Sequence, residues 1–184
     1  MPDSDFGYTR WGKDWVRLAE PLKQSKPEPL LPRARSIARN GAVQLVIDGN
    51  TVRANLHRGS EASVTHLEFA PFGHATVEAL HAVIPAGALT LGDELREAVS
   101  AAGIKVTPEL VASDCSCRAR NARCLHLYAA LYAIVLRVDE NPWLALDLQG
   151  YRSGGVAEAD GEEAIAAPRW TPIDTLDPVA YFGD

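Results

Sequence analysis

All three cysteines of this chain, and one of its five histidines, lie within twelve residues, in the segment DCSCRARNARCLH. Cys115 and Cys117 form a Cys-x-Cys pair, and after six further residues Cys124 and His126 form a Cys-x-His pair. Three thiolates and one imidazole complete a tetrahedral ligand set for zinc, and sulfur-rich sets select zinc over magnesium, calcium or manganese. Because no ligand position is left for water or substrate, the spacing predicts one structural zinc ion rather than a catalytic one.

Three other uses of the cysteines stay open. A disulfide would leave one thiol over, and Cys-x-Cys is an awkward loop to close. A nucleophilic cysteine paired with His126 would need only one of the three thiols. Unligated cysteines, clustered by chance, are the third alternative. Zinc is the interpretation that uses all four residues.

The same spacing predicts the local structure of the site. Residues two apart on an α-helix point about 200° apart, so Cys124 and His126 cannot share one helix face. They converge if Cys124 precedes a helix and His126 lies in its first turn. The segment LHLYAALYAIVLR, from Leu125, has good helix formers and neither Gly nor Pro. We expect Cys115 and Cys117 in a tight turn or short strand over this helix end. The helix is apolar on nearly every face, which indicates that it is buried.

The motif and the apolar helix behind it resemble the SWIM zinc finger, which is defined by Cys-x-Cys, a variable gap and Cys-x-His. The similarity extends upstream to YTRWGKDW and RARSIARNGAVQLVIDGNTVRANL and downstream to LRVDENPWLALDLQG, roughly residues 8 to 150. The gap RARNAR is more basic than the family pattern. The resemblance implies a non-enzymatic module for DNA binding or protein interaction that acts with a Swi/Snf-type helicase. The alternative is a protein–protein adaptor without nucleic-acid contact.

Patterns outside the motif predict an α+β fold. Apolar residues alternate with polar or small ones over about residues 42–70, and Gly49-Asn50 is a hairpin turn signal, so we expect a small antiparallel β-meander. Residues 74–102 show helical spacing, and the zinc finger covers about 105–139. We expect residues 1–150 to form a single SWIM-type domain, with the zinc ligands on a knuckle and a helix N-terminus.

The acidity of the chain is concentrated at its C-terminal end. The formal net charge is −6, yet residues 1–138 carry +2 and residues 139–184 carry −8. Residues 151–184 are rich in Gly, Ala and acids, so we expect an acidic, partly disordered tail whose aromatic end could dock on the body. With no signal-like or membrane-spanning stretch, and with reduced thiols, we expect a cytoplasmic protein without membrane contact.

Arginines inside the finger are the candidate recognition residues. Arg118, Arg120 and Arg123 lie in a stretch that has no acid from Cys115 to Leu136. Arginine suits contact with phosphates and grooves, so we expect these three to bind nucleic acid. The alternative is that they offset the thiolate charge and pair with Asp114 or the tail. A zinc or cysteine enzyme is disfavoured because the ligand set is closed and no general base is paired, so we expect no catalytic residue and no small-molecule substrate.

A second aromatic and basic cluster lies near the start of the chain. Trp11 and Trp15 are four residues apart, with Arg10, Lys13 and Arg17 around them. Such a cluster could be a stacking platform for nucleic acid. Tryptophan is more commonly buried in a core, which is the alternative.

Overall fold

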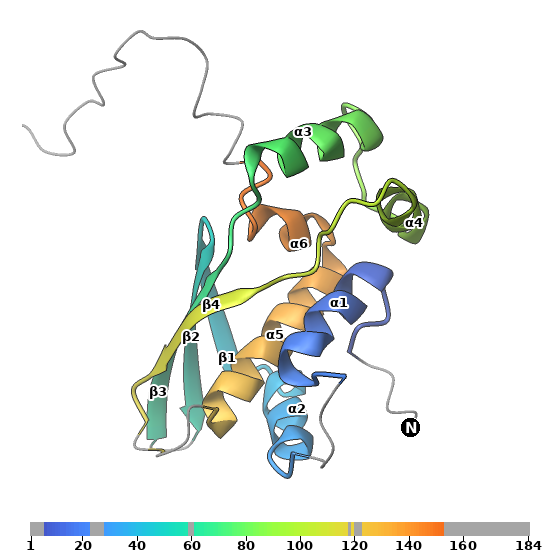
Figure 1. The fold of residues 1–184 in the computed structure, drawn as a ribbon. Coiled ribbons are helices and arrows are strands. Elements are labelled where there is room, and N and C mark those ends of the chain that lie inside the picture. Colours follow the sequence, from blue (N-terminus) through green and yellow to red (C-terminus); the bar gives the residue numbers. More distant parts are fainter. Residues whose placement is uncertain (1–5, 23–27, 59–60, 118, 120–122, 153–184) are drawn as a thin grey trace, which may run out of the picture.

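One antiparallel sheet, with helices packed against one of its faces, forms the fold (Figure 1). The computed structural model describes residues 6–22, 28–58, 61–117, 119 and 123–152. Within these residues two helices precede three strands, two more helices follow, and a fourth strand leads into the last two helices. This is the α+β class that the sequence predicts.

The predicted meander consists of β1 (Val43–Asp48), β2 (Thr51–Arg58) and β3 (Glu61–Phe69). Successive strands pair antiparallel, and Gly49 adopts a positive φ of 55° in the tight turn between β1 and β2. Alternate side chains point to opposite faces of a strand. On β2 and β3 one face is therefore buried, and its residues are Val52, Ala54, Leu56, Thr65, Leu67 and Phe69.

The sheet gains a fourth strand from the finger itself. β4 (Leu110–Cys115) pairs antiparallel with β3, with Cys115 opposite Thr65. The sequence indicated only a tight turn or short strand at Cys115 and Cys117, and it gave no partner strand. The first half of the finger is thus an edge strand of the body.

The long apolar helix α5 (Leu125–Glu140) occupies the centre of the molecule, as its composition predicts. The sheet lies on one side of it, and α1 (Arg10–Ala19) and α2 (Leu31–Arg39) pack along it on another (Figure 1). Although α5 is apolar, no helix in the described part of the chain is long and apolar enough to cross a membrane.

Three shorter helices close one end of the body. They are α3 (His74–Val83), α4 (Asp93–Ala101) and α6 (Trp143–Asp147), gathered beyond the C-terminal end of α5 (Figure 1). Their apolar side chains join the same core through Leu80, Val99 and Leu146. The predicted helical middle is therefore two helices, separated by residues 84–92.

Both N-terminal tryptophans belong to the core. Trp11 and Trp15 are each 1% exposed, and the ring of Trp15 meets Phe69 edge-on with centroids 4.9 Å apart. The indole N–H of Trp11 donates to the carbonyl of Gly92 at 3.3 Å. No base could stack on rings buried in this way. The stacking-platform interpretation is wrong, and core packing is the correct alternative.

A buried carboxylate near the end of α5 holds the start of α1. Asp139 is 4% exposed and accepts hydrogen bonds from the Gly7 N–H at 2.6 Å, the Thr9 N–H at 3.0 Å and the Thr9 hydroxyl at 2.7 Å. Thr9 is also the N-cap of α1 and accepts from the Gly12 N–H at 2.9 Å. A Cβ on Gly12 would lie 2.0 Å from Oδ1 of Asp139. Hence α1 reaches this carboxylate only because residue 12 has no side chain.

We expect Gly12→Ala to lower the free energy of unfolding by about 2–4 kcal/mol, because the new methyl group must displace a buried, hydrogen-bonded carboxylate. Urea unfolding of the zinc-loaded protein measures this change. The control is Gly73→Ala, where a Cβ meets nothing within 4 Å and the loss should stay below about 1 kcal/mol. Equal losses in the two variants would contradict the packing argument.

Candidate metal centre

Pairing with β3 fixes the position of Cys115 and Cys117. Cys115 is the last residue of β4. The next residue, Ser116, donates its backbone N–H to the carbonyl of Val64 at 2.9 Å, and its hydroxyl accepts from the Val64 N–H at 2.9 Å. Ser116, the middle residue of the Cys-x-Cys turn, is therefore hydrogen-bonded to β3 through both its backbone N–H and its side-chain hydroxyl. This is the short strand and turn that the spacing predicts.

Cys124 and His126 are placed by the start of α5. Cys124 is the N-cap, with an extended backbone (φ −91°, ψ 169°), and its Sγ accepts a hydrogen bond from the Leu127 N–H at 3.4 Å. His126 follows in the first turn. The two side chains converge because Cys124 is outside the helix, as the 200° argument requires. The positive end of the helix dipole also favours negative charge on this sulfur.

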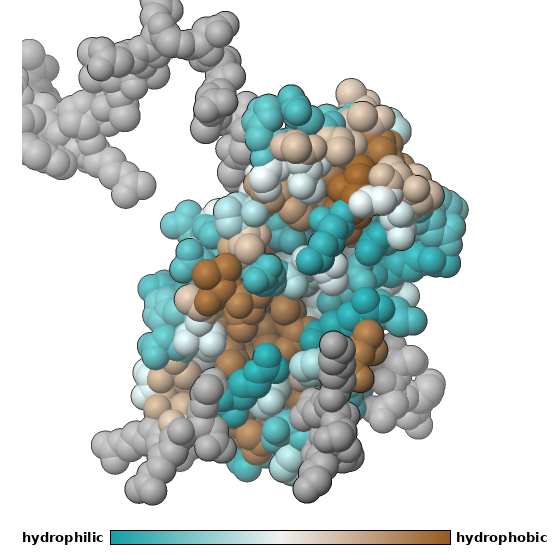
Figure 2. Space-filling view, in the orientation of Figure 1, coloured by the Kyte–Doolittle hydropathy of each residue, from teal (hydrophilic) through white to brown (hydrophobic). Residues whose placement is uncertain are grey.

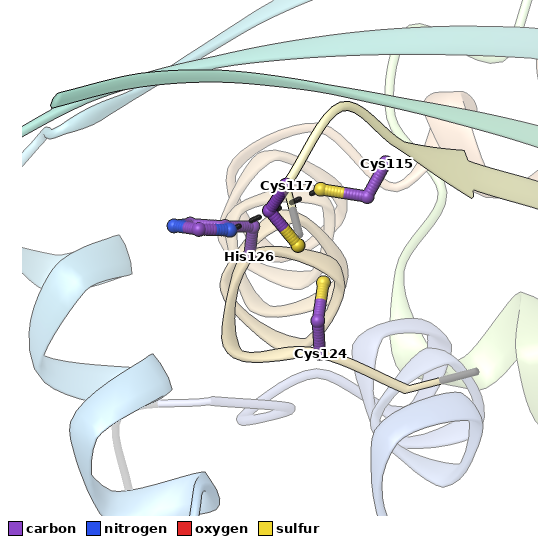
Figure 3. Close-up of side chains that lie close together, drawn as sticks. All are labelled: Cys115, Cys117, Cys124 and His126. Atoms are coloured by element: carbon purple, nitrogen blue, oxygen red, sulfur yellow. Dashed lines mark hydrogen bonds between the residues drawn. The ribbon is translucent and has the colours of Figure 1, made fainter. Parts of the chain in front are cut away.

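The four side chains meet at one point between the sheet edge and the helix end (Figure 3). Their ligand atoms all lie within 4.8 Å of one another, and Nδ1 of His126 is 3.9 Å from Sγ of Cys115. Zinc–sulfur bonds of 2.3 Å in a tetrahedron place sulfurs about 3.8 Å apart, so a shift of about 1 Å or less closes the cluster around an ion. The donor set and its size fit zinc.

Thr65 supports the cluster, and the motif alone could not reveal it. Its side chain is fully buried, and its hydroxyl donates to Sγ of Cys115 at 3.4 Å. The contact exists because β3 and β4 pair with Thr65 opposite Cys115 on the inward face. The only signal in the sequence is a polar residue at an inward position of an alternating strand. Such supporting hydrogen bonds orient metal ligands and tune their basicity.

The thiols differ in acidity. For Cys115, burial opposes ionisation, but hydrogen bonds from Thr65 and from the backbone and thiol of Cys117 outweigh it, so its pKa is lowered. For Cys124, burial and the neighbouring thiols raise the pKa to about 12, despite the Leu127 N–H. Without a cation, Cys115 therefore ionises more readily than Cys124, whose thiol keeps its proton. A divalent ion would displace that proton, since thiolate is the form that binds metal.

The finger arginines are only partly placed. Arg118 and Arg120 lie outside the described residues. Arg123 is exposed, and its Nη1 donates to the carbonyl of Leu18, near the end of α1, at 3.1 Å. This contact, which the sequence did not suggest, attaches the finger to α1. In the described part of the chain, the Cys/His cluster is the one group of three or more His, Cys, Asp or Glu residues close enough to hold a metal.

We expect Thr65→Val to weaken zinc binding about tenfold, because the isosteric side chain removes the hydroxyl that supports Cys115 and leaves the packing intact. Competition with a zinc chelator of known affinity measures the change. Thr51→Val, on the neighbouring strand, is the control, because its hydroxyl bonds the Asp48 carbonyl away from the cluster. Unchanged zinc affinity in Thr65→Val would contradict the supporting role.

The match to known families agrees with this geometry. Residues 103–135 match the family model of the SWIM zinc finger, a range that includes β4, the four clustered residues and α5 as far as Val135. No curated protein and no solved structure matches the chain. A SWIM finger and a cluster of this composition together support one structural zinc ion. Residues 103–135 of this chain are therefore a SWIM zinc finger.

Proposed function

We propose that Cys115, Cys117, Cys124 and His126 hold the zinc ion, and that the zinc-stabilised finger binds DNA without catalysing a reaction. The ligand assignment is supported by the convergence of three sulfurs and one imidazole nitrogen, which fill a tetrahedral shell. A filled shell provides no position for a substrate. The match to a family of binding modules supports the non-enzymatic part of the proposal.

In this proposal zinc acts as a crosslink inside the body. It joins the end of β4, at Cys115, to the start of α5, at Cys124 and His126. Edge strand β4 pairs with β3 alone in the described structure, so the ion provides a second attachment. Binding energy of this kind contributes to folding, on the order of 10 kcal/mol in small zinc modules.

We expect His126→Ala to lose zinc and to lower the stability by at least about 3 kcal/mol, which is about 6–12 °C in Tm for a chain of this length. Zinc content by atomic emission and thermal unfolding by circular dichroism are the measurements. His66→Ala is the matched control, since His66 is exposed on β3, one residue from Thr65. Full zinc content with an unchanged Tm in His126→Ala would refute the ligand assignment.

DNA contact is assigned to Arg118, Arg120 and Arg123. The observation that carries it is their position inside a SWIM finger, between two pairs of candidate ligands and in a stretch without acids. Arg123 donates one N–H to Leu18, but a guanidinium has five donors, so four stay available to phosphates. Arginine is the residue best suited to bidentate phosphate contact.

Titration of labelled single- and double-stranded DNA at low and moderate salt tests this assignment. We expect the affinity for DNA to fall as the salt concentration rises. In the triple variant Arg118→Ala, Arg120→Ala, Arg123→Ala the slope of log K against log salt should become shallower by about three. Absence of binding even at low salt would favour the adaptor alternative, in which the finger contacts only protein.

We also infer a Swi/Snf-type helicase as the partner and the cytoplasm as the location. The first inference rests on the resemblance to bacterial SWIM proteins, and the second on cysteines that must stay reduced to bind metal. Calorimetric titration of the chain against a purified ATPase of that class tests the partnership.

A further inference from the structure

A cleft between α1 and α4 carries a formal positive charge. Its volume is about 700 Å³. Hydrophilic residues gather over α4 and the neighbouring end of α1 (Figure 2). The charged residues that line the cleft are four cations and two carboxylates, a formal balance of +2; they are Arg10, Lys13, Arg17, Arg96, Asp14 and Glu97.

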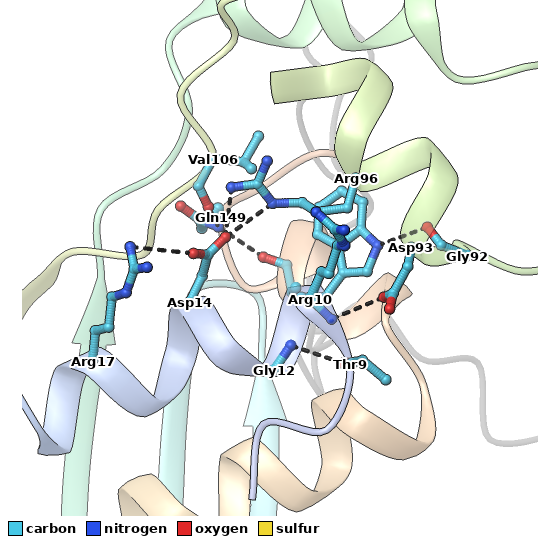
Figure 4. A network of polar contacts seen from close by, with 12 residues as sticks. Thr9, Arg10, Gly12, Asp14, Arg17, Gly92, Asp93, Arg96, Val106 and Gln149 are labelled. Atoms are coloured by element: carbon cyan, nitrogen blue, oxygen red, sulfur yellow. Dashed lines mark hydrogen bonds and ion pairs between the residues drawn. The ribbon is translucent and has the colours of Figure 1, made fainter. Parts of the chain in front are cut away.

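The deepest of these charges are satisfied within the protein. Asp14 is 8% exposed and accepts from Arg96 through Nε at 2.9 Å and Nη2 at 2.6 Å (Figure 4). The guanidinium of Arg96 also lies 5.6 Å from the ring centroid of Trp11. Arg96 therefore holds α4 onto α1 and neutralises Asp14, and it forms the floor of the cleft rather than a contact for a partner.

The outer cations remain accessible. Arg17 is 44% exposed and lies 3.6 Å from the carboxylate that Arg96 already neutralises. Arg10 pairs with Glu97, but both side chains are more than half exposed, and such pairs contribute little in water. Lys13 is exposed between them. A phosphate could therefore contact these cations without breaking a buried ion pair.

The three outer cations form a row. Positions 10, 13 and 17 share one face of α1, and the helix rises about 10 Å between the first and the last. One DNA strand carries a phosphate about every 3.4 Å along the duplex axis, so the row is long enough for about three phosphates. One residue beyond Arg17, the carbonyl of Leu18 accepts from Arg123 of the finger. The row and the finger are thus adjacent.

We propose that this cleft is a second phosphate-binding site, which takes the DNA backbone next to the segment held by the finger. This inference rests on the proposed function. It adds Arg10, Lys13 and Arg17 to the contact surface, and it assigns to them backbone contact without base recognition.

The test uses the full zinc-loaded chain and a labelled duplex of random sequence. In Lys13→Ala/Arg17→Ala we expect affinity at moderate salt to fall about tenfold, and the slope of log K against log salt to fall by about two. The matched control is Arg53→Ala/Arg137→Ala, which removes the same charge. Arg53 is exposed on the sheet, and Arg137 has an i, i+3 carboxylate partner as Arg17 does. All variants should keep their zinc content and Tm.

The outcomes separate the two proposals. A cleft variant that binds like the control variant overturns the cleft site, and DNA binding that still depends on the finger arginines then leaves the proposed function standing. A cleft variant that loses affinity while the finger variant does not supports the cleft and removes the finger contact. If the wild-type chain does not bind the duplex even at low salt, both proposals fail. Binding of poly-glutamate in its place would assign the cleft to an acidic protein segment.

Discussion

The burial of α5 is the constraint on which the rest of the structure depends. A helix that is apolar on nearly every face must be covered on every side, and here the sheet, α1 and α2 provide the cover. Burial also leaves the polar groups at both helix ends in need of partners. At the first end the sulfur of Cys124 accepts the Leu127 N–H, and near the last the Tyr8 hydroxyl donates to the backbone carbonyl of Asp139, whose carboxylate also accepts three hydrogen bonds from Gly7 and Thr9. The candidate metal centre and the anchor of α1 therefore lie at the two ends of one buried helix.

The predictable parts of this arrangement are those that depend on residues close together in the sequence. Ligand spacing depends on residues at most eleven positions apart, and strand alternation on residues two apart, so the finger and the meander are visible in the chain itself. The contact of Thr65 with Cys115 spans 50 positions, and that of Asp14 with Arg96 spans 82. No local pattern encodes such pairings. The N-terminal tryptophans show the limit directly. Their i, i+4 spacing is compatible with a stacking platform or with the more common core packing, and the packing of α1 in the body decides between them.

Arg123, the finger arginine that the structure describes, contacts α1 rather than the cysteine cluster. Three thiolates around a divalent ion leave about one negative charge at the site. Nearby arginines could compensate it, which was the alternative to DNA contact. Arg123, however, donates to a backbone carbonyl of α1 rather than to a sulfur. The sulfur of Cys115 instead accepts a hydrogen bond from the neutral hydroxyl of Thr65. Arg123 is exposed, and its described hydrogen bond is made to α1 and not to the cluster.

Helix α1 connects the two basic surfaces. Asp139 accepts hydrogen bonds from the start of this helix, Arg96 donates to Asp14 in its middle, and Arg123 donates to the Leu18 carbonyl near its end. The cation row on its outer side is therefore positioned by the core, by α4 and by the finger together. Under the proposed ligand assignment, zinc would also help to position this row, because Arg123, which contacts Leu18, is the neighbour of Cys124. The Cys/His cluster and the cleft are thus linked through α1, which packs against α5 and accepts the Arg123 hydrogen bond.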